Sequence, residues 1–176
     1  VGKPVFGDNC KFKYDAVITA EDGSAVEFVD FDTEITLPKG LATVTWTVTD
    51  SAKLSATCTH TINVLDTISP SITCEDDVDG FADVASCLWT GDVTKPTFED
   101  NCNVVTLTYE AKDDKGNVIA LTDATDKVSG SFPIGTTTIT WKVTDKSGNS
   151  KSCKQDVIIK DNIAPKVECA DEISVV

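Results

Sequence analysis

The seven cysteines are the residues whose type and spacing could do chemistry, either as disulfides or as metal ligands. Six of them form three pairs at a nearly constant distance: Cys58 and Cys153 are 95 residues apart, Cys74 and Cys169 are 95 apart, and Cys10 and Cys102 are 92 apart. Cysteines that recur in phase with a repeat are typical of disulfides in an exported protein. A zinc site is the alternative, but no C-x-x-C pair occurs and the cysteines are widely spaced.

Spacing alone does not define which cysteines pair, but the expected order of strands favours three bonds. These are Cys102–Cys153, Cys10–Cys58 and Cys74–Cys87. We expect Cys169 to be unpaired, with its partner beyond Val176, just as the twin of Cys87 would precede residue 1. Each of the two long bridges closes a loop of roughly 50 residues, which the chain-entropy model converts into stabilisation on the order of 4 kcal/mol.

The single histidine and the missing catalytic motifs argue against an enzyme. His60 falls in an expected strand, and the residue 95 positions later is Gln155. A general base cannot be replaced by glutamine, so the strand position of His60 favours a structural role. The sequence also lacks G-x-S-x-G, a phosphate-binding glycine loop and H-E-x-x-H. We therefore predict a protein without catalytic residues.

The sequence of the strand expected to position the cysteines occurs twice in the chain. Residues 37–50 read LPKGLATVTWTVTD and residues 132–145 read FPIGTTTITWKVTD. Around Trp46 and Trp141, apolar residues alternate with polar ones, and this period of two with β-branched residues predicts a strand with one buried face. The Pro-x-Gly that precedes each strand predicts a turn. The chain is therefore a tandem array of β domains about 95 residues long, a size that can bury a modest core.

Further repeats give the domain boundaries. Residues 1–10 and 93–102 agree at seven of ten positions, so the first repeat is expected to begin partway through its second strand. The junction DTISP at 66–70 reappears as DNIAP at 161–165, where proline stops a strand and so short a linker limits the angle between repeats. We predict a partial repeat at 1–65, a complete one at 66–160, and at 161–176 a linker and the first strand of a third, around Ile173 and Val175.

The expected strands of the first repeat lie at 12–18, 25–31, around Trp46 and at 57–65. Those of the complete repeat lie near 70–75, 87–94, 103–111, 117–123, 127–131, 136–144 and 152–160. Seven short strands with turns at regular spacing predict an all-β fold of tandem immunoglobulin-like β-sandwich domains. In such a fold, we expect Trp46 and Trp141 in the core and Trp89 as the one candidate for exposure, for example as a sugar-stacking surface.

The charge of the chain limits the classes of partner that it can bind. Acidic residues outnumber basic ones 29 to 15, the formal net charge is −14, and every basic residue is lysine. Such a surface repels nucleic acid and anionic lipid, and the absence of arginine removes the usual bidentate phosphate ligand. No run of 18 apolar residues occurs, so we expect no direct membrane insertion.

The combined pattern resembles one family, the hyalin repeat (HYR) domain. The motifs are DNIAPKVEC, FEDNC and FPIGTTTITWKVTDKSGNSKSC, and the resemblance covers essentially the whole chain. It implies an immunoglobulin-like, extracellular domain associated with adhesion. The lysine-only, acidic composition is similar to that of very long cell-surface adhesins of gliding Bacteroidetes. The first copy departs from the pattern at 49–54, TDSAKL, which has lost the Gly-Asn pair.

Acidic and amide side chains of three loops form a candidate calcium site. In an immunoglobulin-like sandwich, the entering linker, the loop between the second and third strands and the last hairpin lie at one end. These loops carry Asp66, Glu99, Asp100, Asn101, Asp145 and Asn149. Calcium takes six to eight oxygen ligands, and a bound ion would stiffen the junction that contains Asp66. The alternative is that these residues form turns by capping local backbone groups.

These observations predict a structural or adhesive repeat segment of a large exported cell-surface protein, braced by disulfides. Its partners would be adjacent repeats of the same chain and surface glycans or proteins, with no cofactor besides calcium. The alternatives are a carbohydrate- or protein-binding module and an accessory domain of a secreted enzyme. We also expect the incomplete first repeat to present unpaired sheet edges, which the strand at 173–176 of a neighbouring molecule could fill.

Overall fold

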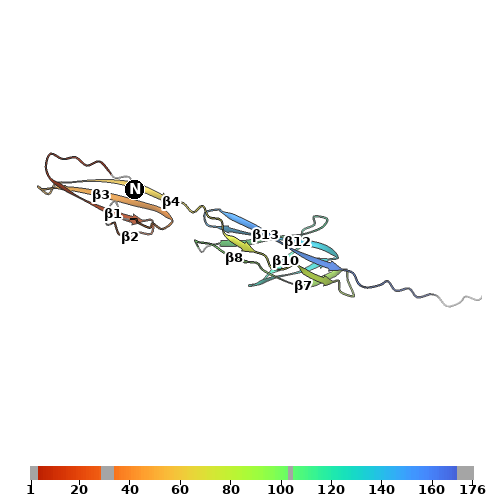
Figure 1. Ribbon diagram of the computed structural model, residues 1–176. Helices are drawn as coiled ribbons and strands as arrows, with labels where there is room; N and C mark the ends of the chain where they lie inside the picture. The colour runs from red at the N-terminus through yellow and green to blue at the C-terminus, as the bar shows by residue number, and fades with distance from the viewer. Residues whose placement is uncertain (1–3, 29–33, 103–104, 170–176) are drawn as a thin grey trace, which may run out of the picture. The chain divides into compact units, whose positions relative to one another are not determined.

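The computed structural model describes residues 4–28, 34–102 and 105–169 (Figure 1). The chain divides into two compact units, unit 1 (Val1–Thr67) and unit 2 (Ile68–Val176). The described residues form strands, turns and loops without any helix, which confirms the all-β prediction. Within them, accordingly, no helix is long and apolar enough to cross a membrane. The repeat boundaries at 65/66 and 160/161 stay a prediction, and the strand predicted around Ile173 and Val175 lies outside the described residues.

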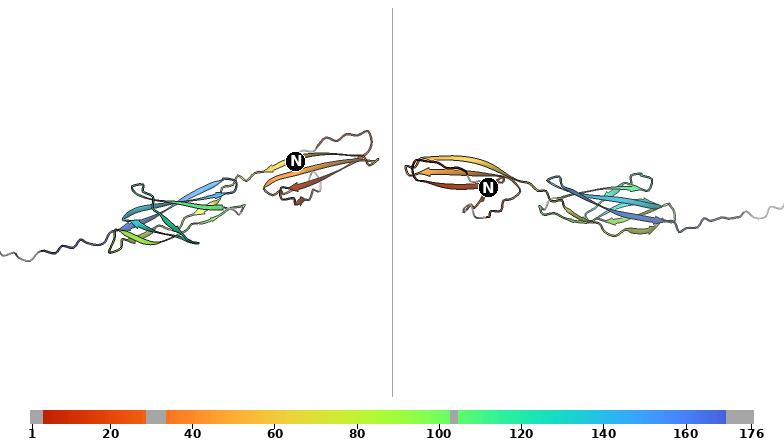
Figure 2. Two further views of the ribbon diagram at one scale, coloured as in Figure 1. Left: turned by 180° about the vertical axis from the view of Figure 1, so that it is seen from behind. Right: turned by 45° about the horizontal axis from the view of Figure 1, so that its top comes forward.

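Unit 1 is built on one antiparallel sheet of four strands (Figure 2). Its strands are β1 (Phe12–Ala20), β2 (Ala25–Val26), β3 (Gly40–Asp50) and β4 (Ser55–Val64), in the order β2-β1-β3-β4. In the predicted strand at 25–31, Ala25 and Val26 pair with β1, and residues 29–31 lie outside the described part.

Alternation along β1 and β3 buries one face of this sheet. Ile18, Val44 and Trp46 are almost fully buried, and loop residues such as Phe6 and Phe28 pack against them. The ring of His60 on β4 stacks against the ring of Trp46, with 6.5 Å between the centroids. The core of unit 1 is therefore a sheet covered by loops on its buried face.

Unit 2 is a β-sandwich. Its strands are β5 (Ser71–Thr73), β6 (Val78–Phe81), β7 (Leu88–Thr94), β8 (Thr97–Glu99), β9 (Val105–Asp113), β10 (Leu121–Asp123), β11 (Lys127–Pro133), β12 (Gly135–Asp145) and β13 (Ser150–Lys160). One layer has the order β10-β11-β7 and the other β6-β13-β12-β9, with β5 and β8 as a separate pair. The predicted strand at 117–123 is reduced to β10 and a bridge between Val118 and Lys112.

The alternation of apolar and polar residues did not predict two strands of unit 2, β6 and β8. β6 contains Gly80, and β8 begins directly after Pro96, shortly past the end of β7. Neither strand therefore has a long period-two pattern. β6 pairs with the end of β13 in parallel, from Val78 opposite Val157 to Phe81 opposite Lys160. This parallel pairing determines which cysteines of unit 2 lie close enough to bond.

The core of unit 2 lies between the two layers. Trp141, Phe132 and Ile139 are fully buried, and Trp46 and Trp141 are both in the core as predicted. The indole N–H of Trp141 donates to Oε1 of Gln155 at 3.2 Å, and Nε2 of Gln155 donates to the carbonyl of Asp76 at 2.8 Å. Gln155 is thus a buried polar residue whose bonds join β12, β13 and the segment that leads into β6.

The Pro-x-Gly turns are present at the predicted positions. Gly40 and Gly135 start β3 and β12 with φ of +116° and +113°. L-amino acids with a side chain rarely adopt this region, so glycine is required at both positions.

Candidate functional site

The disulfide of unit 2 joins the first and last strands of the sandwich. Cys74, directly after β5, bonds to Cys153 on β13, with 5.9 Å between the Cα atoms and 79 residues between the cysteines. The predicted pairs Cys102–Cys153 and Cys74–Cys87 are therefore wrong. The prediction treated Cys74 and Cys87 as the two sides of a simple hairpin. Instead β6 lies between them and runs along β13, which takes Cys87 to the start of β12, where its carbonyl accepts from the N–H of Ile134.

The predicted bond Cys10–Cys58 is also wrong. Both side chains are exposed in unit 1 and are not joined. Cys10 precedes β1, and β3 lies between β1 and β4, so a strand separates the entry of β1 from Cys58 on β4. Cys87 and Cys169 are exposed, while Cys102 is partly buried and its Sγ accepts from Nδ2 of Asn101 at 3.3 Å.

Asp145 and Asn149, from the candidate calcium set, close the hairpin between β12 and β13. Oδ1 of the buried Asp145 accepts from the N–H groups of Ser147 and Asn149, both at 2.8 Å. Oδ2 accepts from Nδ2 of Asn149, also at 2.8 Å. Two of these bonds satisfy backbone donors of the turn and the third comes from the Asn149 side chain, which is the role that the turn alternative assigned to these residues.

The same geometry occurs at a second hairpin outside the candidate set. Oδ1 of Asp113 accepts from the N–H groups of Lys115 and Asn117 at 3.0 and 2.7 Å, and Oδ2 accepts from Nδ2 of Asn117 at 2.8 Å. The bond from the Asn117 side chain is the main reason why the pKa of Asp113 lies below its usual value. The motif Asp-x-x-Gly-Asn is therefore a self-contained turn in this fold.

The loop after β8 differs from these two turns because one of its carboxylate oxygens has no hydrogen-bond partner among the described residues. Oδ2 of Asp100 accepts from the N–H of Cys102 at 2.8 Å, but Oδ1 is buried and has no hydrogen-bond partner among the described residues. Its neighbours Glu99 and Asn101 are exposed. Asp66 belongs to unit 1, where its carboxylate lies 3.6 Å from Nζ of Lys39 and is 1% exposed. The six-residue calcium set stays a prediction, with Asp100 as its member that has an unsatisfied oxygen.

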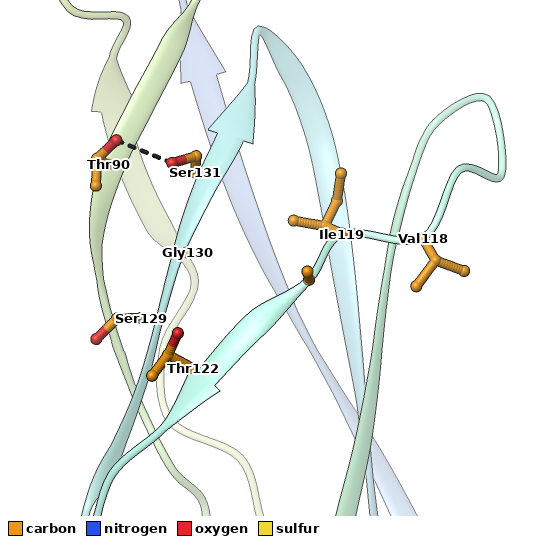
Figure 3. Close-up of a pocket in the computed structure, with 8 residues that line it drawn as sticks. Thr90, Val118, Ile119, Thr122, Ser129, Gly130 and Ser131 are labelled. Atoms are coloured by element: carbon orange, nitrogen blue, oxygen red, sulfur yellow. Dashed lines mark hydrogen bonds between the residues drawn. The ribbon is translucent and has the colours of Figure 1, made fainter.

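A shallow pocket of about 470 Å3 lies on the outer face of the small sheet (Figure 3). Hydroxyl side chains line it, and those of Thr90 and Ser131 hydrogen bond across β7 and β11 at 3.1 Å (Figure 3). Trp89 does not line this pocket. It is half-buried against the core, with its ring 5.6 Å from that of Phe132 and covering Gly91. The residue expected as a sugar-stacking surface therefore packs inward.

The fold and its disulfide define the class of the chain: a sandwich repeat braced between its first and last strands. The HYR domain family matches residues 65–159, more than half of the chain. The chain belongs to the HYR domain family, an extracellular, adhesion-associated family of immunoglobulin-like repeats.

Hyalin of Strongylocentrotus purpuratus is 30% identical over 143 residues, which are 78% of this chain. The chain spans 11% of the length of hyalin. Two solved structures are also similar: protocadherin gammaB7 domains EC3-6, with 15% identity and a TM-score of 0.37, and protocadherin gamma B2 domains 1-5, with 11% identity and a TM-score of 0.35. They cover 88% and 85% of this chain, and this chain matches 41% and 32% of theirs.

Proposed function

We propose that the chain is a structural repeat segment of a large exported cell-surface protein, which holds a distal binding region away from its anchor. The acidic, lysine-only composition favours a bacterial surface adhesin, such as those of Bacteroidetes, as the parent protein. Adjacent repeats would be its constant partners, and weak contacts of each repeat with surface glycans or proteins would add through multivalency. The repeat itself makes and breaks no bonds in a substrate.

The position of the disulfide is the observation that carries this proposal. Tension along a chain of repeats enters unit 2 near Ile68 and leaves it after Lys160. Cys74 and Cys153 are six and seven residues inside these points, so the bridge withholds 79 residues from extension. At about 3.5 Å per residue, those residues represent about 280 Å of chain that cannot be released under load. A stalk needs this property, whereas a soluble binding module does not.

Single-molecule force spectroscopy tests the stalk role. The chain is pulled through its two ends with the bridge intact and after reduction. We expect the extension released by unit 2 to be about 280 Å longer after reduction, because only then do residues 74–153 unravel. The variant Cys87→Ser is the matched control and should behave as the unaltered chain. Equal extensions with and without reductant would contradict the load-limiting role of the bridge.

We further propose that calcium binds at the loop after β8 and stiffens the repeat. The support is Oδ1 of Asp100, a buried carboxylate oxygen without a hydrogen-bond partner among the described residues. Such an oxygen carries a desolvation cost that a cation would offset, and oxygen is the ligand that calcium prefers. Glu99 and Asn101 flank Asp100 and would contribute further oxygens, and the set predicted from sequence also includes Asp66, Asp145 and Asn149.

Thermal unfolding with millimolar calcium tests this second proposal. If calcium is present at about ten times its dissociation constant, the native state gains about 1.4 kcal/mol, which raises the Tm by about 6–11 °C for a domain of this size. Asp100→Asn should abolish the rise, while Asp83→Asn, a change in the loop after β6, should retain it. Asp145→Ala is a poor test because it also breaks the turn. An unchanged Tm in calcium would remove the proposal.

A ligand-binding module remains the second candidate function, because the pocket in Figure 3 presents several hydroxyl groups to solvent. Glycan-array binding by the chain, lost in Thr122→Val and retained in the matched variant Thr138→Val on the opposite layer, would favour it. The inward packing of Trp89 weakens this candidate, since carbohydrate sites commonly use an exposed aromatic ring.

A further inference from the structure

A pocket lined by lysines lies at one end of the sheet in unit 1. It has a volume of about 330 Å3 and is formed by the start of β1 and the hairpin between β3 and β4. Lys11, Lys13 and Lys53 line it, and they are three of the four lysines in the described part of unit 1. The whole chain carries a net charge of −14. Three cations gathered at one place in so acidic a chain create a local attraction for an anion.

The charges of these three lysines are not neutralised by ion pairs. The salt bridges among the described residues are formed by Lys39 in unit 1 and by lysines of unit 2. One carboxylate, that of Asp50, also lines the pocket, but its Oδ1 accepts from the N–H of Leu54 at 2.9 Å and so closes the hairpin. Three ammonium groups against one carboxylate leave the pocket with a net charge of +2.

The backbone of Lys53 has a conformation that normally requires glycine. Its φ is +72°, and the residue 95 positions later in the corresponding hairpin is Gly148, with φ of +89°. A side chain in this region is strained, and such residues cluster at binding sites. The hairpin closes in the same way in both units, because the N–H of Asp50 donates to the carbonyl of Leu54 at 2.9 Å as that of Asp145 does to Asn149 at 3.0 Å. The turn therefore does not need lysine, and what Lys53 adds is a cation at the pocket.

The corresponding corner of unit 2 is exposed and uncharged at these positions. Lys13 lies opposite Thr49 on β3 just as Thr106 lies opposite Thr144 on β12, so Thr106 is its counterpart. Thr106 and Gly148 are both exposed, although the whole of unit 1 precedes unit 2 in the chain. Residues ahead of a repeat thus leave this corner accessible. The lysines make the pocket a property of unit 1, and the neutral corner of unit 2 serves as an internal comparison.

The remaining walls of the pocket suit a sugar ring. Phe12 lines it and is 36% exposed, which provides a flat apolar surface beside the lysines. Thr49 and Ser51 line it as well, and their hydroxyl groups can both donate and accept hydrogen bonds. The volume is at the lower end of the range for small-molecule sites, as expected for a single sugar residue. A pyranose ring with a carboxylate would meet all three features: its C–H face the phenyl ring, its hydroxyls the side-chain hydroxyls, and its carboxylate the ammonium groups.

We propose that this pocket binds a uronic acid residue of an acidic surface polysaccharide, with the sugar carboxylate held by Lys11, Lys13 and Lys53. The inference rests on the proposed weak contacts with surface glycans, and it names their site in unit 1 and the class of sugar. The negative charge of the chain does not prevent binding, because the Debye length is about 8 Å at physiological ionic strength. A carboxylate inside the pocket is therefore attracted by the lysines around it, while acidic side chains farther away are screened.

An NMR titration of the whole 15N-labelled chain with trigalacturonate tests the proposal. The buffer is free of calcium, so that no ion bridges the sugar and the acidic chain. We expect shifts of the backbone amides of residues 11–13 and 49–54, and none with the neutral trisaccharide maltotriose. An equal response of the same amides to hexaglutamate would assign the pocket to acidic peptides and overturn the sugar proposal.

The variant Lys53→Gly separates binding from folding. It copies Gly148 of unit 2, so it removes a cation from the pocket and the backbone strain together. We expect about tenfold weaker binding of trigalacturonate, with a Tm of unit 1 that is unchanged or higher. Lys146→Gln is the matched control, because it removes one lysine from the corresponding hairpin of unit 2 and changes the net charge equally. Lys53→Gly that binds as tightly as the unaltered chain, or shifts spread evenly over both units, would overturn the proposal.

The sugar site and the stalk role fail in different ways. The stalk role depends on the Cys74–Cys153 bridge of unit 2, whereas the lysines of the pocket lie in unit 1. If trigalacturonate does not bind but reduction lengthens the extension of unit 2, the sugar site is wrong and the stalk role stands. If trigalacturonate binds as expected but the extension is the same with and without reductant, the stalk role is wrong and the sugar site stands.

Discussion

At the scale of single residues, the acidic side chains act by closing turns and by bridging strands. Asp92, on the outer face of β7, accepts from Nζ of Lys127 at 2.5 Å and from Oγ of Ser129 at 2.6 Å on β11. The bond from Lys127 and, after it, the bond from Ser129 hold the pKa of Asp92 below its usual value. The same carboxylate raises the pKa of Lys127. Each of these bonds favours the charged forms.

These shifts predict a loss of stability in acid. A carboxyl group with a lowered pKa in the folded state stabilises the fold above its unfolded pKa, near 3.8, and loses that contribution as the pH falls through the folded pKa. We therefore expect the Tm of unit 2 to decline below about pH 4. In Asp92→Asn the decline should be shallower, because one such carboxylate is gone. Thermal melts from pH 2 to 7 measure this decline, with Glu168→Gln as the control. An equal fall of Tm with pH in Asp92→Asn and Glu168→Gln would contradict the prediction.

At the scale of elements, Gln155 joins three segments of unit 2. Replacement by leucine would remove the acceptor of the Trp141 indole and the donor to the Asp76 carbonyl, both in the core or at its edge. Each buried polar group without a partner costs about 1–3 kcal/mol, so the two orphaned groups in Gln155→Leu should lower the free energy of unfolding by about 2–6 kcal/mol. Gln155→His, which copies unit 1, should lose less because imidazole both donates and accepts. Urea unfolding measures the free energy of unfolding of each variant. A leucine variant as stable as the unaltered chain would contradict the role of Gln155 in joining the three segments.

Much of the fold could be predicted from sequence because long strands here bury one face. β3 and β12 alternate over 11 residues each, and both tryptophans on them are buried as that pattern requires. β6 and β8 have only four and three residues, so no period could show. The disulfide was mispredicted for the same reason: without β6, nothing in the sequence indicates that the chain crosses to β13 before Cys87.

The candidate site was only partly accessible to sequence reasoning. Asp and Asn near turns predict both calcium binding and turn closure, and the hydrogen bonds of Asp145 fit the second. The identical bonds at Asp113 could have favoured turn closure earlier, since DDKGN and DKSGN share the spacing of Asp, Gly and Asn. The unsatisfied oxygen of Asp100 has no sequence signal, because its burial depends on packing of the whole loop.

At the scale of the whole molecule, the two units have unequal means of stabilisation. Unit 2 buries a core between two layers and has a covalent bridge. Unit 1 buries a smaller set of residues on one face of one sheet and leaves the edge of β4 open among the described residues. Less apolar area removed from water means a smaller free energy of unfolding.

Two separate unfolding transitions follow from this inequality. In dilute solution we expect unit 1 to melt first and without response to reductant. Unit 2 should melt later, and reduction of Cys74–Cys153, which closes a loop of 79 residues, should cost it about 4 kcal/mol in the chain-entropy model. Trp46→Phe makes fluorescence report on unit 2 alone, and calorimetry then assigns the remaining transition. A single transition that shifts as a whole on reduction would show that the units do not unfold independently.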